Sequence, residues 1–195
     1  MENEIHIQGL PLIQVQADGT DSVTKKRIVI IGMDPAASRH CGWAVVSIEN
    51  GQPVLLEKMT QTITREAEDF GRLDDIYHFL DDLITKYSPT ILCTERQTGG
   101  GLIFVRSNLN EVVGVAKLCC FRRGVSVVEE SPAHLKKLIA GHGRAKKKHI
   151  KANIVATFGL KKAGPEHECD AAACALCCFV DLGWPGYQIK VPFVP

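Results

Sequence analysis

One apolar run, Arg27–Met33, constrains the fold of this chain more than any other feature, and it ends on Asp34 followed by a proline. Its β-branched residues fit a buried strand, and the proline ends that strand. Trp43–Ile48 and Val54–Met59 are expected to form two further strands, because the Asn50-Gly51 pair between them is a strong hairpin signal. The sequence therefore predicts a three-stranded meander at the start of the fold.

Helical and strand patterns alternate after this meander. Apolar residues recur at helical spacing in the longer segments, whereas the two shorter segments are continuous apolar runs that fit buried strands. The expected order is helix, strand, helix, strand and three helices, at residues 70–84, 90–95, 102–120, 125–128, 132–140, 144–158 and 168–182. Together these elements predict an α/β fold with a mixed five-stranded sheet, antiparallel in its first three strands and flanked by helices.

Length and composition indicate one globular domain. The chain has 195 residues, of which 45% are hydrophobic and 23% charged. We expect this domain at residues 27–183, between an N-terminal extension at 1–26 and a C-terminal tail at 184–195. Charge or glycine breaks the apolar runs before the roughly 20 residues that a membrane span needs. The N-terminus lacks the basic start and apolar stretch of a secretory signal, so we expect a soluble intracellular protein with no membrane association.

The eight cysteines are expected to be reduced thiols, because an intracellular compartment does not favour disulfides. Cys174 and Cys177 would share one face of a helix. A zinc site needs two more ligands at a suitable spacing, and no second Cys-x-x-Cys occurs. We therefore interpret these cysteines as small core residues.

Basic residues are concentrated in one part of the chain, although the net charge is only +1. Between Ser131 and Pro165 there are nine Lys or Arg residues and no acid, whereas Glu66–Asp82 carries seven acids and one Arg. This asymmetry favours a phosphate-binding surface over an ordinary solvated face. The basic side chains that we place on this surface are Lys136, Lys137, Arg144, Lys146, Lys147, Lys148 and Lys151.

Two of the predicted strands end on carboxylates. Asp34 closes the first strand and Glu95 the fourth, and in open α/β sheets ligands collect at the carboxyl ends of strands. His167 and Asp170 would share a face at the start of the last helix, where an acid also suits simple N-terminal capping. Three carboxylates and an imidazole that converged would repel one another without cations, and such ligands suit Mg²⁺ or Mn²⁺. With a basic surface beside it, this cluster has the layout for phosphodiester hydrolysis by two metal ions.

Four segments, in this order along the chain, resemble the RuvC-type Holliday-junction resolvases. The first is Ile28-Val-Ile-Ile-Gly-Met-Asp34-Pro-Ala-Ala-Ser, in which Ala36 and Ala37 replace the family's usual Gly-Ser. Thr94-Glu95-Arg-Gln is similar to the family's Ile-Glu-Gln, Leu135–Lys147 follows its basic pattern, and His167-Glu-Cys-Asp170 resembles its closing motif in the His-x-x-Asp form. The resemblance runs from about residue 27 to 182.

This resemblance implies an RNase H-like fold, a homodimer, Mg²⁺ dependence with two ions per active site, and paired incisions in four-way DNA junctions. It implies that Asp34, Glu95, His167 and Asp170 bind the metal. The basic residues named above would contact DNA, with Lys136 and Lys147 near the scissile phosphate. In the family, an aromatic residue after the second motif packs against bases, and Phe104 is the nearest candidate here, a core role being the alternative. A viral or phage protein would fit as well as a bacterial one.

Three other functions stay open. The first is another nuclease on the same fold, such as a flap or branch nuclease, although motif order and the His-x-x-Asp ending argue against a ribonuclease H. The second is an ATPase of the actin and sugar-kinase class, which would need glycines where this chain has Pro35, Ala36 and Ala37. The third is a junction-binding protein without activity, which would not need all four expected metal ligands.

Overall fold

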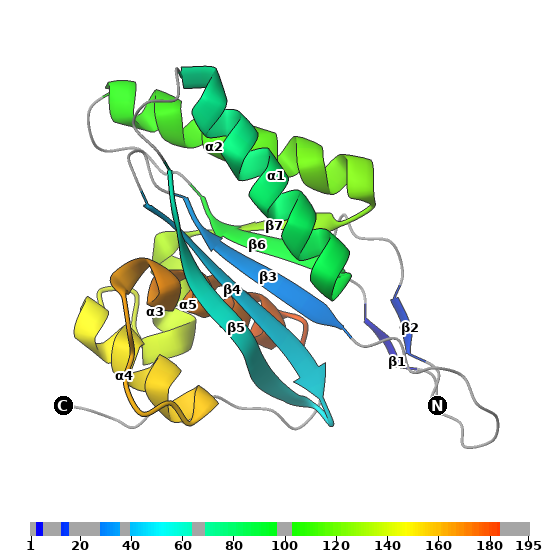
Figure 1. Ribbon diagram of the computed structural model, residues 1–195. Helices are drawn as coiled ribbons and strands as arrows, with labels where there is room; N and C mark the ends of the chain where they lie inside the picture. Colours follow the sequence, from blue (N-terminus) through cyan, green and yellow to red (C-terminus); the bar gives the residue numbers. More distant parts are fainter. Residues whose placement is uncertain are drawn as a thin grey trace.

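The computed structural model describes residues 3–5, 13–15, 28–35, 40–63, 69–96 and 103–183, with the backbone alone at 3–5, 13–15, 69–70 and 103–107. Its main sheet has five strands in the order β5-β4-β3-β6-β7 (Figure 1). β3 pairs with β4 and β4 with β5 in antiparallel fashion, while β3–β6 and β6–β7 are parallel. The strands are β3 (Val29–Asp34), β4 (His40–Glu49), β5 (Gln52–Thr62), β6 (Ile91–Glu95) and β7 (Ser126–Glu130). This arrangement confirms the predicted mixed five-stranded sheet, antiparallel in its first three strands.

The β4–β5 hairpin turns at the predicted place. Asn50 and Gly51 have φ values of 51° and 74°, the left-handed backbone that a type I′ turn needs at both central positions. Both strands are longer than predicted, because antiparallel pairing continues beyond the apolar residues as far as His40 opposite Thr62.

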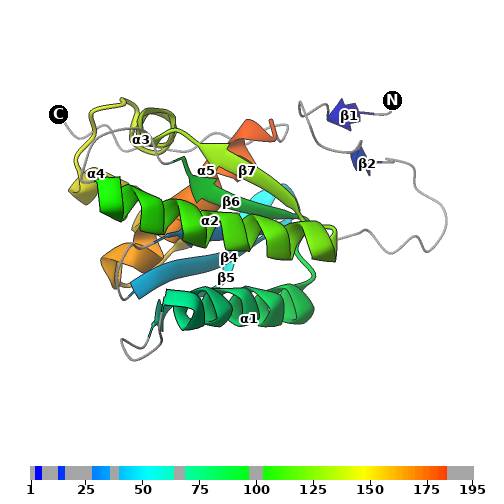
Figure 2. The same cartoon turned by 90° about the horizontal axis from the view of Figure 1, so that it is seen from above.

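Helices cover both faces of the sheet (Figures 1 and 2). α1 (Asp69–Tyr87) and α2 (Ile103–Arg123) lie on one face, and α3 (Pro132–Ala140), α4 (Lys147–Phe158) and α5 (Glu166–Asp181) lie on the other. Because side chains alternate along a strand, β3 contributes to two cores: Ile31 packs on the α1–α2 side and Ile30 on the α5 side.

Two helix starts differ from the sequence expectation. α4 begins at Lys147 rather than Arg144, because Gly141 ends α3 in the left-handed conformation and an irregular segment separates the two helices. α5 begins at Glu166, two residues earlier than expected, with Pro165 at its N-cap. His167 therefore lies within the first turn of α5.

All eight cysteines are buried free thiols, and Cys174 and Cys177 pack between α5 and the sheet, as predicted. Within the described residues, none of the helices has the length and apolar character needed to cross a membrane. β1 (Asn3–Ile5) and β2 (Ile13–Val15) pair in a separate two-stranded sheet. Most of the two terminal segments lies outside the described residues, so the expected domain limits stay a prediction.

Candidate metal centre

Asp34 and Glu95 end neighbouring strands. β3 and β6 are parallel, and their register pairs Met33 with Thr94, one residue before each acid. The two carboxylates therefore sit side by side at the carboxyl edge of the sheet, where sequence analysis placed them. Asp34 is only 19% exposed at its side chain.

Two glycines allow α5 to lie directly on the sheet beside these acids. A Cβ atom on Gly32 would lie 1.9 Å from the backbone oxygen of Ala171, and one on Gly42 would lie 2.0 Å from the backbone oxygen of His167. Any side chain at these positions of β3 and β4 would push the helix away. The close approach brings the first turn of α5 to the end of β3.

Three of the four predicted ligands take part in hydrogen bonds at this edge. Nδ1 of His167 lies 2.7 Å from Oδ2 of Asp34, so the imidazole and the carboxylate form a direct pair. Asp170 accepts a hydrogen bond from Nζ of Lys147 at 3.1 Å, and the same ammonium also contacts Glu166. The structure thus brings a predicted DNA-binding lysine into the acidic cluster.

The electrostatics of the cluster disfavour its negative charge. Burial raises the pKa of Asp34; the His167 hydrogen bond opposes this, and the Asp170 carboxylate adds to it. Burial also raises the pKa of Glu95, and Asp34 and Asp170 add to that shift, while Lys136 and Lys147 oppose it. These mutual effects place Glu95, Asp34 and Asp170 in one electrostatic group.

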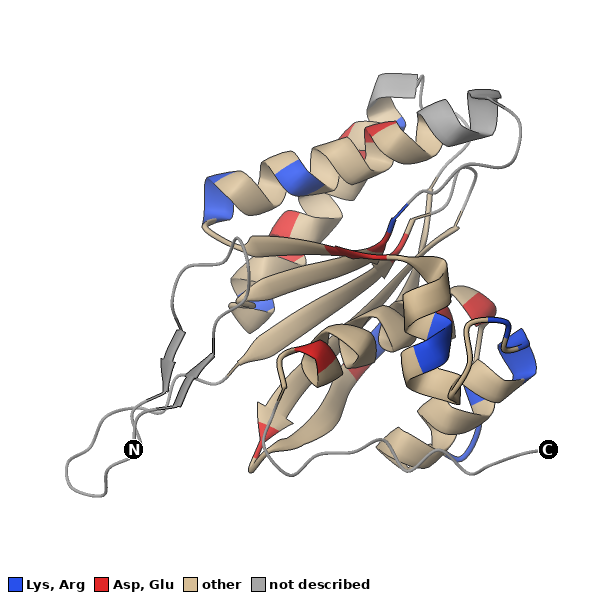
Figure 3. Ribbon diagram, turned by 180° about the vertical axis from the view of Figure 1, so that it is seen from behind, with Lys and Arg blue, Asp and Glu red and all other residues tan. Residues whose placement is uncertain are grey.

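The basic residues predicted to bind phosphate lie on α3, on α4 and in the segment between them, on the same face of the sheet as α5 (Figure 3). The exposed side chains of this surface are Lys137, Arg144, Lys146, Lys147 and Lys148, and the half-buried ones are Lys136 and Lys151. Lys151 pairs with Glu166 at 3.6 Å, so part of this surface borders the acidic cluster. The side chain of Phe104 lies outside the described residues.

Comparison with known proteins identifies the family. Residues 30–178 match the family described as crossover junction endodeoxyribonuclease RuvC. The chain belongs to the RuvC family. A relative of that name from Corynebacterium diphtheriae is 34% identical over 149 residues, covering 75% of this chain and 91% of the relative. Another from Halorhodospira halophila is 33% identical over 155 residues, covering 76% and 87%.

Solved structures agree with this assignment. The structure of Thermus thermophilus RuvC superimposes with a TM-score of 0.73 at 26% identity and covers 80% of this chain and 98% of its own. RuvC of the same organism in complex with a Holliday junction substrate shares the fold, with a TM-score of 0.71 at 23% identity. The family and fold inferred from the four sequence motifs are thus confirmed.

The donor set fits a hard divalent cation, as RuvC-family membership implies. His167 contacts Asp34, and the Asp34, Glu95 and Asp170 carboxylates interact electrostatically. Carboxylate oxygens and an imidazole are ligands that Mg²⁺ and Mn²⁺ accept. Burial, and after it repulsion from neighbouring carboxylates, raises the pKa values of Asp34 and Glu95, and a cation among these groups would offset that repulsion.

Some residues that build the site could not be recognised in the sequence. Nζ of Lys58 on β5 lies 2.7 Å from Glu168 and 2.8 Å from the backbone oxygen of Ala163, which fastens the start of α5 to the sheet. Glu166 holds Lys147 and Lys151 beside the cluster. Lys58 and Glu168 are 110 positions apart, so no local pattern signals their contact.

Proposed function

We propose that this RuvC-family chain is a structure-selective endonuclease that resolves four-way DNA junctions by Mg²⁺-dependent hydrolysis with two ions per active site. The observation that carries the proposal is the position of Asp34, Glu95, His167 and Asp170 at one edge of the sheet, where the three carboxylates interact electrostatically beside a basic surface. The names of the RuvC relatives and the junction-bound Thermus protein agree with this substrate.

Asp34, Glu95, Asp170 and His167 would hold the cations. When bound, Mg²⁺ supplies a Lewis acid that polarises the scissile phosphate and lowers the pKa of a bound water. The chain itself orients His167 through the 2.7 Å contact with Asp34. His167 is 42% exposed, so its free ring nitrogen is accessible to solvent or substrate.

Lys147 is placed to exchange partners. Its ammonium contacts Asp170 and Glu166 in the protein alone, and its long stem allows it to turn toward a DNA phosphate. The charge of Lys136 lowers the pKa of the Glu95 carboxyl, so this lysine lies close enough to the cluster to act on it. The remaining basic residues of α3 and α4 would contact backbone phosphates without reading sequence.

We further propose a homodimer that uses the outer face of α2. The apolar stripe of Leu102, Val105, Leu109, Val112 and Val113 could serve as an interface or pack on the sheet, and Val112 and Val113 are buried within the chain's own core. Leu118 and Phe121, which are 47% and 83% exposed, are the exposed large hydrophobic residues of the described part. A two-fold contact there would give two acidic clusters for two opposed cuts.

Cleavage of defined substrates tests the activity. The protein is incubated with Mg²⁺ and a mobile four-way junction, a linear duplex, a flap or an RNA–DNA hybrid, and Asp34→Asn serves as the inactive control. We expect paired nicks in the junction and far slower cutting of the other three. Equal cutting of the flap would make this a broader branch nuclease, and equal cutting of the hybrid would make it a ribonuclease H.

A further inference from the structure

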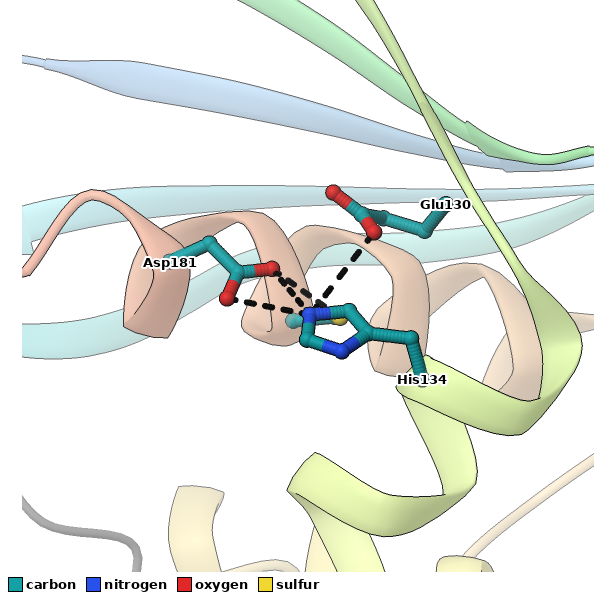
Figure 4. Close-up of side chains that lie close together, drawn as sticks. Glu130, His134 and Asp181 are labelled. Atoms are coloured by element: carbon teal, nitrogen blue, oxygen red, sulfur yellow. Dashed lines mark hydrogen bonds and ion pairs between the residues drawn. The ribbon is translucent and has the colours of Figure 1, made fainter. Parts of the chain in front are cut away.

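A second group of potential metal ligands lies away from Asp34 and His167. Glu130 ends β7, His134 stands in the first turn of α3, and Cys177 and Asp181 lie one turn apart near the end of α5. Their ligand atoms all lie within 4.8 Å of one another. Figure 4 shows the side chains of Glu130, His134 and Asp181 pointing toward one another from three different elements.

The distances in this group are close to those of a tetrahedral metal site. Nε2 of His134 lies 2.8 Å from Oδ2 of Asp181 and 3.8 Å from Oε2 of Glu130, and Sγ of Cys177 lies 3.7 Å from Oδ2 of Asp181. Ligand bonds of about 2.0 to 2.3 Å at zinc place tetrahedral ligands about 3.3 to 3.8 Å apart. Two of these three contacts already have this spacing and the His134–Asp181 contact would have to open slightly, while the ligand atoms of the remaining pairs lie within 4.8 Å of one another.

Rigid structure holds each of these residues. The side chain of Ser131 accepts a hydrogen bond from the backbone N–H of His134 at 3.2 Å, which caps α3 and fixes the position of His134. Cys177 and Asp181 are four residues apart and so share one face of α5. Cys177 is fully buried, whereas His134 and Asp181 are more than a third exposed, so a cation could enter from solvent and meet the thiol at the inner end.

An ordinary ion pair between His134 and Asp181 explains only part of this arrangement. A second carboxylate, Glu130, and a buried thiol converge on the same imidazole. Burial and then the Asp181 carboxylate raise the pKa of Glu130, so the group carries negative charge poorly without further cations. The neighbouring His134 and Arg96 side chains lower the pKa of Glu130 and so oppose that shift.

We propose that Glu130, His134, Cys177 and Asp181 form a binding site for a zinc-class dication. One sulfur, one imidazole nitrogen and two carboxylate oxygens are a donor set that Zn²⁺ and Co²⁺ accept and that Mg²⁺ does not favour. Binding would form a metal–sulfur bond and release the thiol proton of Cys177 to solvent, while neutral His134 donates the lone pair of Nε2.

This site would connect β7, α3 and α5 next to the metal centre of the proposed nuclease. Glu130 pairs with Glu95 in the β6–β7 register, so the site lies one strand further along the same sheet edge. Along α5, Asp181 lies eleven residues after Asp170, about 16 Å at the rise of an α-helix. The proposed zinc site shares no ligand with the cluster at Asp34 and does not depend on nuclease activity.

Metal titration of the full chain tests the proposal. Purified protein, stripped with chelator, is titrated with Co²⁺ and with Zn²⁺ in excess Mg²⁺. We expect one tightly bound Co²⁺ per chain, with the thiolate-to-cobalt charge-transfer band and the intense visible bands of tetrahedral cobalt. Zn²⁺ should displace this Co²⁺ and raise Tm. Asp34→Asn should bind both metals unchanged, which separates this site from the other centre.

Matched variants identify the ligands. Cys177→Ser should abolish the charge-transfer band, and His134→Gln should weaken Zn²⁺ binding at least tenfold. The controls are Cys178→Ser, a neighbouring buried thiol on α5, and His78→Gln, whose exposed imidazole also pairs with an aspartate four residues away. Both controls should bind like the unmodified chain. If Cys177→Ser does not fold, the Zn²⁺ affinities of His134→Gln and Asp181→Asn test the proposal, because both substitutions are at partly exposed side chains.

Three results would each overturn the proposal. The first is an unmodified chain that takes up no Zn²⁺ or that binds Co²⁺ without the sulfur band. The second is a Cys177→Ser variant that keeps that band. The third is a loss of affinity in the controls as large as in His134→Gln.

Discussion

At the scale of single residues, the pair formed by Asp34 and His167 is central to the candidate metal centre. The 2.7 Å contact joins a mostly buried carboxylate to a partly exposed imidazole, and Asp170 is held one turn further along the same helix. The acids would supply the negative charge that binds the cations. None of them belongs to the exposed basic surface on α3 and α4. Metal binding and DNA binding are therefore expected to be separable by substitution.

We expect Asp34→Asn, Glu95→Gln and Asp170→Asn each to lower junction cleavage by at least about 100-fold, since about 2.7 kcal/mol of transition-state stabilisation would be lost. Junction affinity in Ca²⁺ should remain within a few-fold, because the basic residues are untouched. Gel-shift and single-turnover cleavage assays measure the two effects. Cleavage by any of these variants near the unmodified rate would remove that residue from the site.

His167 should tolerate a carboxylate better than an apolar side chain. A carboxylate can bind a cation as imidazole does, whereas a methyl group cannot. We expect His167→Asp to keep part of the cleavage rate and His167→Ala to lose most of it. Rates equal to that of the unmodified protein for both variants would mean that His167 only pairs with Asp34.

At the scale of elements, the position of α5 on the sheet decides whether the ligands meet. The helix lies on β3 and β4 at two glycines, and the Lys58–Glu168 ion pair fastens its start to β5. α3 and α4 then bring the basic residues to the same face. Small changes at the helix–sheet contact should therefore affect both stability and activity.

Gly32→Ala should destabilise the fold by about 3 kcal/mol, because its methyl group would overlap the backbone of Ala171 and α5 would have to move. Gly114→Ala is the matched control, since nothing lies within 4 Å of a Cβ there. In the middle of α2 this control should stabilise by about 0.5–1 kcal/mol. Urea unfolding at a fixed protein concentration measures both. A neutral Gly32→Ala would contradict the close helix–sheet contact.

Lys136→Ala and Lys147→Ala should each weaken junction binding and flatten its salt dependence. Because log K falls as log salt rises, the loss of one phosphate contact makes this slope less negative by about 0.9. Lys86→Ala is the control, because Lys86 ends α1 on the opposite face and pairs with Glu57. Fluorescence anisotropy over a salt series measures the slopes. An unchanged slope in both variants would place the DNA elsewhere.

At the scale of the whole molecule, the two faces of the sheet have different proposed functions. α5 and the basic helices lie on one side of the sheet with the acidic cluster, and α1 and α2 lie on the other. The exposed Phe121 and Leu118 belong to that second side. A dimer built through α2 would leave both acidic clusters free for DNA.

Phe121→Glu should convert the proposed dimer to a monomer, because a carboxylate would have to be buried without a partner at the interface. Sedimentation of the unmodified chain at micromolar concentration should give twice the 21.4 kDa chain mass, and that of the variant should give one chain mass. The variant should nick junctions on one strand instead of cutting both within one binding event. A monomeric unmodified chain that still makes paired cuts would refute the dimer.

The sequence alone determined the order of the elements and the chemical character of the site. Strand patterns, the Asn50-Gly51 turn and acids at two strand ends depend on local preferences of the backbone and on side-chain periodicity, which neighbouring residues express directly. The acids at the ends of the first and fourth predicted strands would meet if those strands were adjacent, and the structure shows that β3 and β6 are. Helical spacing singled out His167 and Asp170, and the family resemblance then assigned them to the metal site.

Only the tertiary structure decided which distant residues touch. His167 and Asp34 are 133 positions apart, and their contact depends on α5 packing against glycine backbone rather than on any local pattern. Packing likewise buried Val112 and left Phe121 exposed on the same helix. It also joined His134 to Asp181 beside Cys177, which the sequence alone presented as a core residue. Such contacts depend on the shape of packed surfaces, and helix and strand periodicity do not encode that shape.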